Sequence, residues 1–130
     1  MSDNKKSRRE FRENSMKLLY ILEVGGDYER DTVDDEVYNA VSDLISNNDE
    51  IETLLNNSMT GYNLKRLNLV DKCILKFAVY EMMFMDLAPQ IAINEALEIT
   101  KTYSNIDGKQ VAFNNKVLDT AKDLIINGRK

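Results

Sequence analysis

The sequence predicts an all-α protein of about six to seven helices. Apolar side chains recur at three- and four-residue intervals in successive segments, and no segment alternates apolar and polar residues as a half-buried strand would. The single proline, Pro89, separates two of these segments. Because proline lacks an amide hydrogen and disfavours helix at the preceding residue, we expect one helix from about Asn68 to near Asp86 and another after Pro89. A last helix should run from Phe113 to Asn127.

The first part of the chain contains three further expected helices. The first should begin near Ser7, with Glu10 at capping-box spacing, and end at Gly25. The next two, at about residues 32–47 and 51–60, each carry an apolar stripe and are expected to form an antiparallel pair.

Length and composition favour one domain over residues 1–130. With 130 residues and 43% apolar content, the chain can bury one real core but not two comfortable ones. No apolar run approaches the roughly 18 residues that cross a bilayer, and no apolar segment resembling a signal peptide follows the charged start. We therefore expect a soluble cytoplasmic protein with no membrane contact.

Charge is distributed unevenly along the chain. Residues 1–17 contain six cationic and three acidic residues and so carry +3, whereas the formal net charge of the whole chain is −5 and the remainder therefore carries −8. Much of the negative charge lies between Asp27 and Glu52. A basic head on an acidic chain suggests an anionic ligand at one end.

Several kinds of catalytic site lack their parts. The chain has no histidine and one cysteine, so zinc sites and histidine-assisted nucleophiles are not expected, and Cys73 fits the apolar pattern of its helix better than it fits a reactive thiol. No glycine pattern of a phosphate-binding loop is present. Asp34 and Asp35 could serve acid–base or Mg²⁺ chemistry, but adjacent carboxylates are more typical of a solvated helix end. We expect a binding protein with no catalytic residue, metal or cofactor.

RNA is the natural ligand for the basic head. Arg8, Arg9 and Arg12 lie on one expected helix, where guanidinium groups can bind phosphates or stack on unpaired bases. The alternative is that these arginines only pair with Glu10 and Glu13 on an exposed helix. The RNA hypothesis therefore requires that the guanidinium groups form one edge and are not locked in contacts with carboxylates.

Two hydrophobic features have similar alternatives. Tyr20 could stack on a base, although a tyrosine at helical spacing is more often a packing residue. The run from Met82 to Met85 could form an adaptable docking surface, although methionine clusters more often fill a helical core.

Three segments together resemble the NusB family of bacterial transcription antitermination factors over nearly the whole chain. The stretch RREFRENSMKLLYILE is similar to the family's basic opening helix, and LKRLNLVDKCILKFAVYEM is similar to its central helix. The run from Ala92 to Ala96, Ala-Ile-Asn-Glu-Ala after a proline, is the strongest part of the resemblance.

The resemblance implies a fold and a function. It implies two packed helical subdomains, roughly residues 1–61 and 62–130, and a protein that binds boxA-type RNA as a heterodimer with NusE, a ribosomal protein. Such proteins join other Nus factors on RNA polymerase and suppress termination, notably in ribosomal RNA operons. They catalyse no reaction, and the free protein could be a monomer or a homodimer.

The resemblance also implies site residues. An RNA-binding surface would include Lys5, Arg8, Arg9, Arg12, Tyr20, Asp107 and Phe113. A partner-binding surface would include Tyr20, Asp71 and Glu81, with Asp71 the better candidate for the side that faces NusE.

The chain departs from the family pattern near its last helix. The family motif Phe-Val-Asn-Gly-Val-Leu is replaced by FNNKVL, so that Lys116 stands where glycine is common, and the preceding loop is about two residues longer. Because the net charge is −5, we expect only a locally aimed basic patch, joined to that of a basic partner protein, to bind RNA usefully.

Two other functions share this fold. A NusB-like domain also precedes the catalytic domain of certain ribosomal RNA cytosine methyltransferases, and no methyl-donor loop is present in this sequence. The second alternative is a helical module that binds protein and has lost its RNA affinity.

Overall fold

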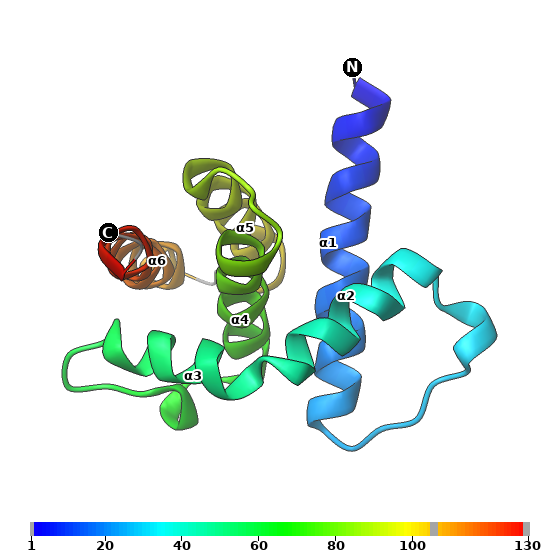
Figure 1. Ribbon diagram of the computed structural model, residues 1–130, viewed down its shortest axis with the longest axis horizontal. Coiled ribbons are helices and arrows are strands. Elements are labelled where there is room, and N and C mark those ends of the chain that lie inside the picture. Colours follow the sequence, from blue (N-terminus) through cyan, green and yellow to red (C-terminus); the bar gives the residue numbers. More distant parts are fainter. Residues whose placement is uncertain (1, 105–106, 129–130) are drawn as a thin grey trace. The chain divides into compact units, whose positions relative to one another are not determined.

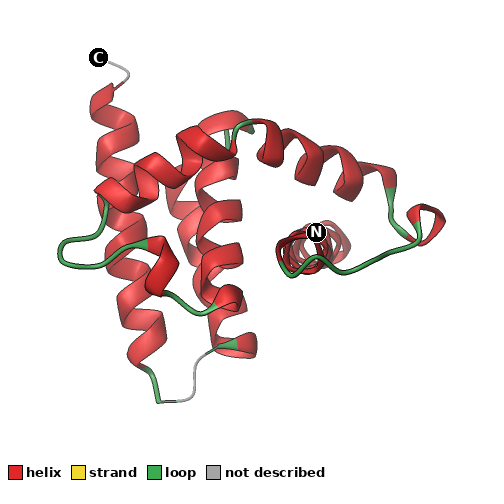
Figure 2. Ribbon diagram, turned by 90° about the horizontal axis from the view of Figure 1, so that it is seen from below, coloured by secondary structure: helices red, strands yellow, loops and turns green. Residues whose placement is uncertain are grey.

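The computed structural model describes residues 2–104 and 107–128, together with the side chains from Ser7 onward, and over this part of the chain it contains helices, turns and loops but no strand (Figures 1 and 2). The all-α prediction is confirmed. The elements are α1 (Ser2–Glu23), η1 (Arg30–Thr32), α2 (Asp35–Ser46), α3 (Asn48–Asn57), η2 (Leu64–Arg66), α4 (Leu69–Phe84), α5 (Pro89–Tyr103) and α6 (Lys109–Gly128). None of the described helices is long and apolar enough to cross a membrane.

The helices divide into two compact units, Met1–Asn47 and Asn48–Lys130. The boundary lies before α3, earlier in the chain than the division near residue 61 that the resemblance implies. Helix α3 packs against α4, α6 and η2, with Ile51 and Leu55 fully buried, and it belongs to the second unit for that reason. The expected pairing of residues 32–47 with 51–60 is therefore wrong.

The first unit is built on the packing of α1 against α2. Leu19 and Val41, one from each helix, are only 1% exposed. Helix α1 begins at Ser2, so the expected capping box at Ser7 is wrong. The physical reason is that neither glycine nor proline interrupts residues 2–7, and a continuous helix satisfies more backbone amides than a cap would.

Glycine ends α1 as expected. Gly25 has φ +71°, its amide donates to the Leu22 carbonyl over 3.2 Å, and the Gly26 amide donates to the Ile21 carbonyl over 2.8 Å. These two bonds are those of a Schellman motif, in which the left-handed residue is most easily a glycine.

Arg30 orders the segment between α1 and α2. Its guanidinium donates to the Val33 carbonyl over 2.9 Å and to Asp35 over 2.8 Å, and it lies 4.0 Å from the centre of the Tyr38 ring. The hydrogen bond to Asp35 raises the pKa of Arg30 above its ordinary value. Asp34 and Asp35 are exposed at the start of α2, which agrees with the solvated helix end expected for them.

Helix α4 is the centre of the second unit. It packs against α3, α5 and α6, which surround it in Figure 2, and Leu75, Phe77 and Val79 are fully buried. Cys73 is 2% exposed, as expected of a small core residue. The methionine run divides, because Met82 is buried whereas Met85 is exposed.

The ends of α4 follow the local sequence. Asn68 caps the helix, since its side-chain oxygen accepts the Asp71 amide over 2.9 Å. The helix ends at Phe84, and Asp86 takes a left-handed φ of +52° before Pro89 starts α5 at its first position. The predicted break before the proline is confirmed.

Candidate nucleic-acid interface

Arg8 is held on the surface of the first unit by two contacts. Its guanidinium lies 2.7 Å from a carboxylate oxygen of Glu36 on α2 and 4.2 Å from the centre of the Phe11 ring one turn along α1. The side chains of Arg8 and Glu36 are 40% and 54% exposed. Exposed ion pairs are worth only about 0.2–1 kcal/mol, so an anionic ligand can compete for this guanidinium.

The other arginines of α1 differ in their exposure. Arg12 is only 5% exposed, and Arg9 is partly buried. The expected edge of three accessible guanidinium groups is therefore reduced, because Arg8 and Arg9 are only partly exposed and Arg12 lies inside the fold. The side chain of Lys5 lies outside the described part of the chain.

The carboxylate partner of Arg8 was not among those expected. The alternative to RNA binding considered from the sequence was that the arginines pair with Glu10 and Glu13 on the same helix. Glu36 instead comes from α2 and lies 28 positions from Arg8 in the sequence. Glu10 is exposed. Spacing along one helix could not reveal a partner that only the packing of two helices brings into reach.

Tyr20 is accessible, with 41% of its surface exposed. It lies three turns beyond Arg8 on α1, so it belongs to the same element as the basic residues. A tyrosine with this exposure can contact a ligand through its ring face or its hydroxyl group.

Asp71 is fully buried, which is at odds with the partner-facing role expected of it. Its carboxylate accepts Ser104 Oγ over 2.7 Å and Asn114 Nδ2 over 3.2 Å, and Asn68 Nδ2 donates to its second oxygen. Asn114 also donates to Thr100 over 3.1 Å. These bonds join the start of α4 to the end of α5 and to α6, so Asp71 has a structural role.

Glu81 is also buried, at 2% exposure. Its backbone carbonyl accepts the amides of Met85 and Leu87 at the end of α4. The two acidic positions expected to bind a partner therefore lie inside the second unit, and neither offers a carboxylate to a docked protein.

Phe113 and Asp107 lie at the start of α6. Asp107 is exposed, and its side-chain oxygen accepts the Lys109 amide over 3.1 Å, which helps to begin the helix. Phe113 is partly buried and packs edge-to-face on Tyr62, with ring centres 5.6 Å apart. Asp107 is thus exposed and Phe113 partly exposed, and the RNA contact expected of them stays a prediction.

Tyr62 and Arg66 complete this surface and were missed by the sequence reasoning. The Arg66 guanidinium lies 5.0 Å from the centre of the Tyr62 ring, and the Tyr62 hydroxyl donates to the Arg66 carbonyl over 3.1 Å. The only signal was a tyrosine and an arginine four positions apart in a segment with no helical pattern.

No group of acidic, histidine or cysteine residues that could hold a metal is found in the described part of the chain.

Comparison with known proteins decides the family. The model of the NusB family matches residues 4–123, which is nearly the whole chain. The chain belongs to the NusB family. The transcription antitermination proteins NusB of Bacillus cereus (strain B4264) and Bacillus thuringiensis (strain Al Hakam) are each 32% identical to it over 130 residues, covering 91% of this chain and 98% of each relative.

Solved structures agree with this assignment. T. maritima NusB matches with a TM-score of 0.77 and 25% identity, over 89% of this chain and 90% of that chain. A chain in a structure described as a plectonemic RNA supercoil matches with a TM-score of 0.78 over 92% of this chain and 96% of that chain, and its 20% identity shows a likeness of fold alone. The protein is thus a NusB-fold member of a family of transcription antitermination proteins.

Proposed function

We propose that this protein binds boxA-type RNA together with NusE and joins other Nus factors on RNA polymerase to suppress termination, especially in ribosomal RNA operons. The observation that carries the proposal is the family match over residues 4–123, together with the nearly complete coverage of antitermination relatives. The accessible cation and aromatic side chains of α1 support it. A family member with these groups on one helix has the chemistry to bind a single-stranded transcript.

Arg8 is the first RNA contact in this proposal. A phosphate offers the guanidinium charge-assisted hydrogen bonds that can replace the exposed contact with Glu36. Lys5 and Arg9 are proposed as further contacts from the same helix, and Tyr20 adds an accessible ring farther along it. Arg12 supports this edge from inside the fold, given its burial, and is no longer proposed as a direct contact.

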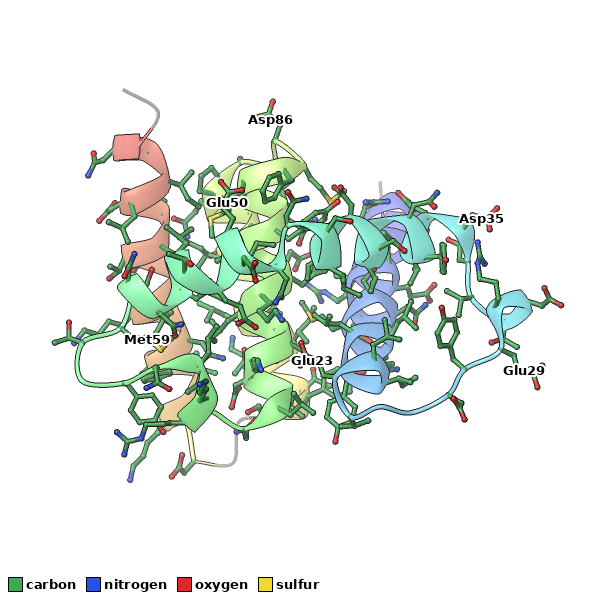
Figure 3. The ribbon with its side chains drawn as sticks, turned by 60° about the horizontal axis from the view of Figure 1, so that its bottom comes forward. Glu23, Glu29, Asp35, Glu50, Met59 and Asp86 are labelled. Carbon is green, nitrogen blue, oxygen red and sulfur yellow. The ribbon has the colours of Figure 1, made fainter. Side chains whose placement is uncertain are left out.

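The acidic segment between α1 and α2 is proposed to receive NusE. Glu29, Asp31 and Asp34 are exposed there, and Figure 3 draws Glu29 and Asp35 pointing outward from this segment. A basic ribosomal protein on this side would bring cations of its own to the RNA. Joining two phosphate-binding surfaces raises affinity without requiring either surface to be strong.

The proposal is tested by the affinity for a boxA-type RNA, measured with and without NusE over a range of salt concentrations. We expect NusE to tighten binding and to steepen the decrease of log affinity with log salt, because more phosphates are neutralised in the joint site. Identical affinity and identical salt slope with and without NusE would contradict the joint RNA site.

A second candidate is a helical module that binds protein and not RNA. The pairing of Arg8 with Glu36 and the burial of Arg12 favour this alternative, since both reduce the cationic surface of α1. It predicts NusE binding in the absence of any measurable affinity for RNA at low salt. The same titration distinguishes the two functions.

A further inference from the structure

We propose that Tyr62, Arg66 and Lys116 form a second contact for single-stranded RNA, on the unit Asn48–Lys130, an inference that rests on the RNA-binding function proposed above. The contact would stack an unpaired base beside Tyr62 and bind the adjoining phosphates through the two cations. It lies on a different unit from the basic residues of α1.

Local charge is the first argument. The two segments that meet here, residues 61–69 and 108–118, contain the cations Lys65, Arg66, Lys109 and Lys116 and no acidic residue, in a chain whose net charge is −5. Asp107, directly before the second segment, lies 3.9 Å from the Lys109 ammonium through its carboxylate, which leaves Arg66 and Lys116 as the cations for a ligand. The contact between Tyr62 and Phe113 brings the two segments together. Phe113 and Lys116 are three positions apart on α6, so both project toward the same side of that helix.

The cations are available to a ligand. Among the described residues, neither the Arg66 guanidinium nor the Lys116 ammonium has an ion pair or a side-chain hydrogen bond, and both side chains are exposed. Arg30 also lies over an aromatic ring, that of Tyr38, but its guanidinium already donates hydrogen bonds to Val33 and Asp35. At Tyr62, by contrast, the arginine that lies over the ring retains its side-chain donors for a phosphate.

The aromatic surface is both accessible and fixed. Tyr62 is 38% exposed, and its ring is held by the edge-to-face contact with Phe113 and by the bond from its hydroxyl to the Arg66 carbonyl. The Leu64 amide donates to Asn56 Oδ1 over 2.9 Å, and the Leu64 side chain is buried. This segment follows Met59 in Figure 3 and runs beside α6 in Figure 2.

These features favour single-stranded RNA over other anionic ligands. A fixed ring stacks on any nucleobase, and flanking cations bind the phosphates of a strand whose bases are turned out. Because the platform is held in place before binding, little side-chain entropy is lost on association. Lys116 stands where the family motif has glycine, so this chain adds a cation at that position.

A single-tryptophan reporter tests the stacking directly. The chain has no tryptophan, so Tyr62→Trp places the only indole at the proposed contact, and Tyr38→Trp places it beside Arg30 as a matched control. We expect a boxA-type RNA, and an oligouridine of similar length, to quench the tryptophan at 62 and to leave the one at 38 unchanged. Equal responses at the two positions would contradict stacking at Tyr62.

Charge removal tests the cations. We expect Arg66→Gln/Lys116→Gln to weaken boxA-type RNA binding about tenfold and to reduce the salt slope by about 1.4, the loss of two phosphate contacts to a single strand. The control Lys101→Gln/Lys122→Gln removes the same charge from an exposed position on α5 and a partly exposed one on α6, both outside the two segments. It should change affinity less than about twofold, because charges outside the contact are largely screened by salt. Circular dichroism establishes that each variant is folded.

The outcomes separate this inference from the proposed function. If charge reversal at Arg8 weakens RNA binding while the changes at residues 62, 66 and 116 have no effect, the second contact is overturned and the proposed function stands. If these changes weaken binding while those at Arg8 do not, the second contact stands and the assignment of α1 fails. Loss of NusE binding with unchanged RNA binding would assign the surface to protein and overturn the inference.

Discussion

Glu36 controls how much of Arg8 is available to a ligand. The carboxylate lies 2.7 Å from the guanidinium, and both side chains are substantially exposed. An RNA phosphate that binds Arg8 must therefore displace Glu36 or approach beside it. Because an exposed ion pair such as Arg8–Glu36 contributes little free energy in water, a phosphate can compete with it.

We expect Glu36→Gln to raise the affinity for boxA-type RNA about threefold, because the phosphate no longer competes with a charged partner. Glu29→Gln makes the same change in net charge on the same unit without touching Arg8, and it should raise affinity by less than about 1.5-fold in physiological salt. Fluorescence anisotropy measures both. An equal gain in the two variants would mean that only overall charge matters and that Arg8 does not contact RNA.

Single residues were predicted well where their partners are local. The cap at Asn68 and the turn at Gly25 depend on atoms a few positions away, and both were predicted from spacing. Asp71 was assigned to a partner-binding surface from the family resemblance, and its burial could not be foreseen because its bonds reach Ser104 and Asn114, which lie 33 and 43 positions along the chain. No local pattern in the sequence specifies such contacts.

At the scale of elements, the network around Asp71 joins α4, α5 and α6. Removing a buried acceptor leaves its donors without partners, at a cost of about 1–3 kcal/mol for each group. We expect Asp71→Ala to lower the free energy of unfolding by about 3 kcal/mol in urea denaturation. The exposed position Asp119 provides the control, since Asp119→Ala should change stability by less than about 0.5 kcal/mol.

A different result at Asp71 would restore the role first expected of it. If Asp71→Ala kept its stability but lost affinity for NusE, the carboxylate would be reaching a partner and not holding three helices together.

The joint between α4 and α5 contains backbone strain at Asp86. This residue has φ +52° without being a glycine, and its side chain points away from the helix end in Figure 3. We expect Asp86→Gly to raise the free energy of unfolding by about 0.5–1 kcal/mol, because glycine adopts this conformation without strain. Asp86→Ala should not be stabilising. If both variants changed stability equally, strain at this position would not be the cause.

The elements themselves were largely predictable. Apolar periodicity located the helices, and proline and glycine located two of their ends. The predicted start of α1 was wrong because a cap signal at Ser7 competes with simple continuation of the helix. The predicted pairing of α3 with α2 was wrong because the periodicity of one segment does not specify which element it packs against. Tyr62 and Arg66 were missed because their segment is short and has no regular pattern.

For the whole molecule, the sum of charges opposes the proposed ligand. A net charge of −5 repels RNA at long range. Binding must therefore come from local cationic surfaces that lie within several ångströms of the RNA phosphates, where salt screens the attraction least. The described structure offers two such surfaces, one on each unit: the α1 edge around Arg8, and the platform of Tyr62, Arg66 and Lys116. The account depends most on the first.

The most direct test is the affinity of Arg8→Glu/Arg9→Glu for a boxA-type RNA, with folding followed by circular dichroism. Arg12 is left in place because its burial would make a change there a test of folding. We expect at least about a tenfold loss of affinity and a flatter salt dependence. The control Lys101→Glu/Lys122→Glu, which makes the same change in net charge, should retain most of the affinity. Equal affinity in the two double variants would contradict the proposal that α1 contacts the transcript.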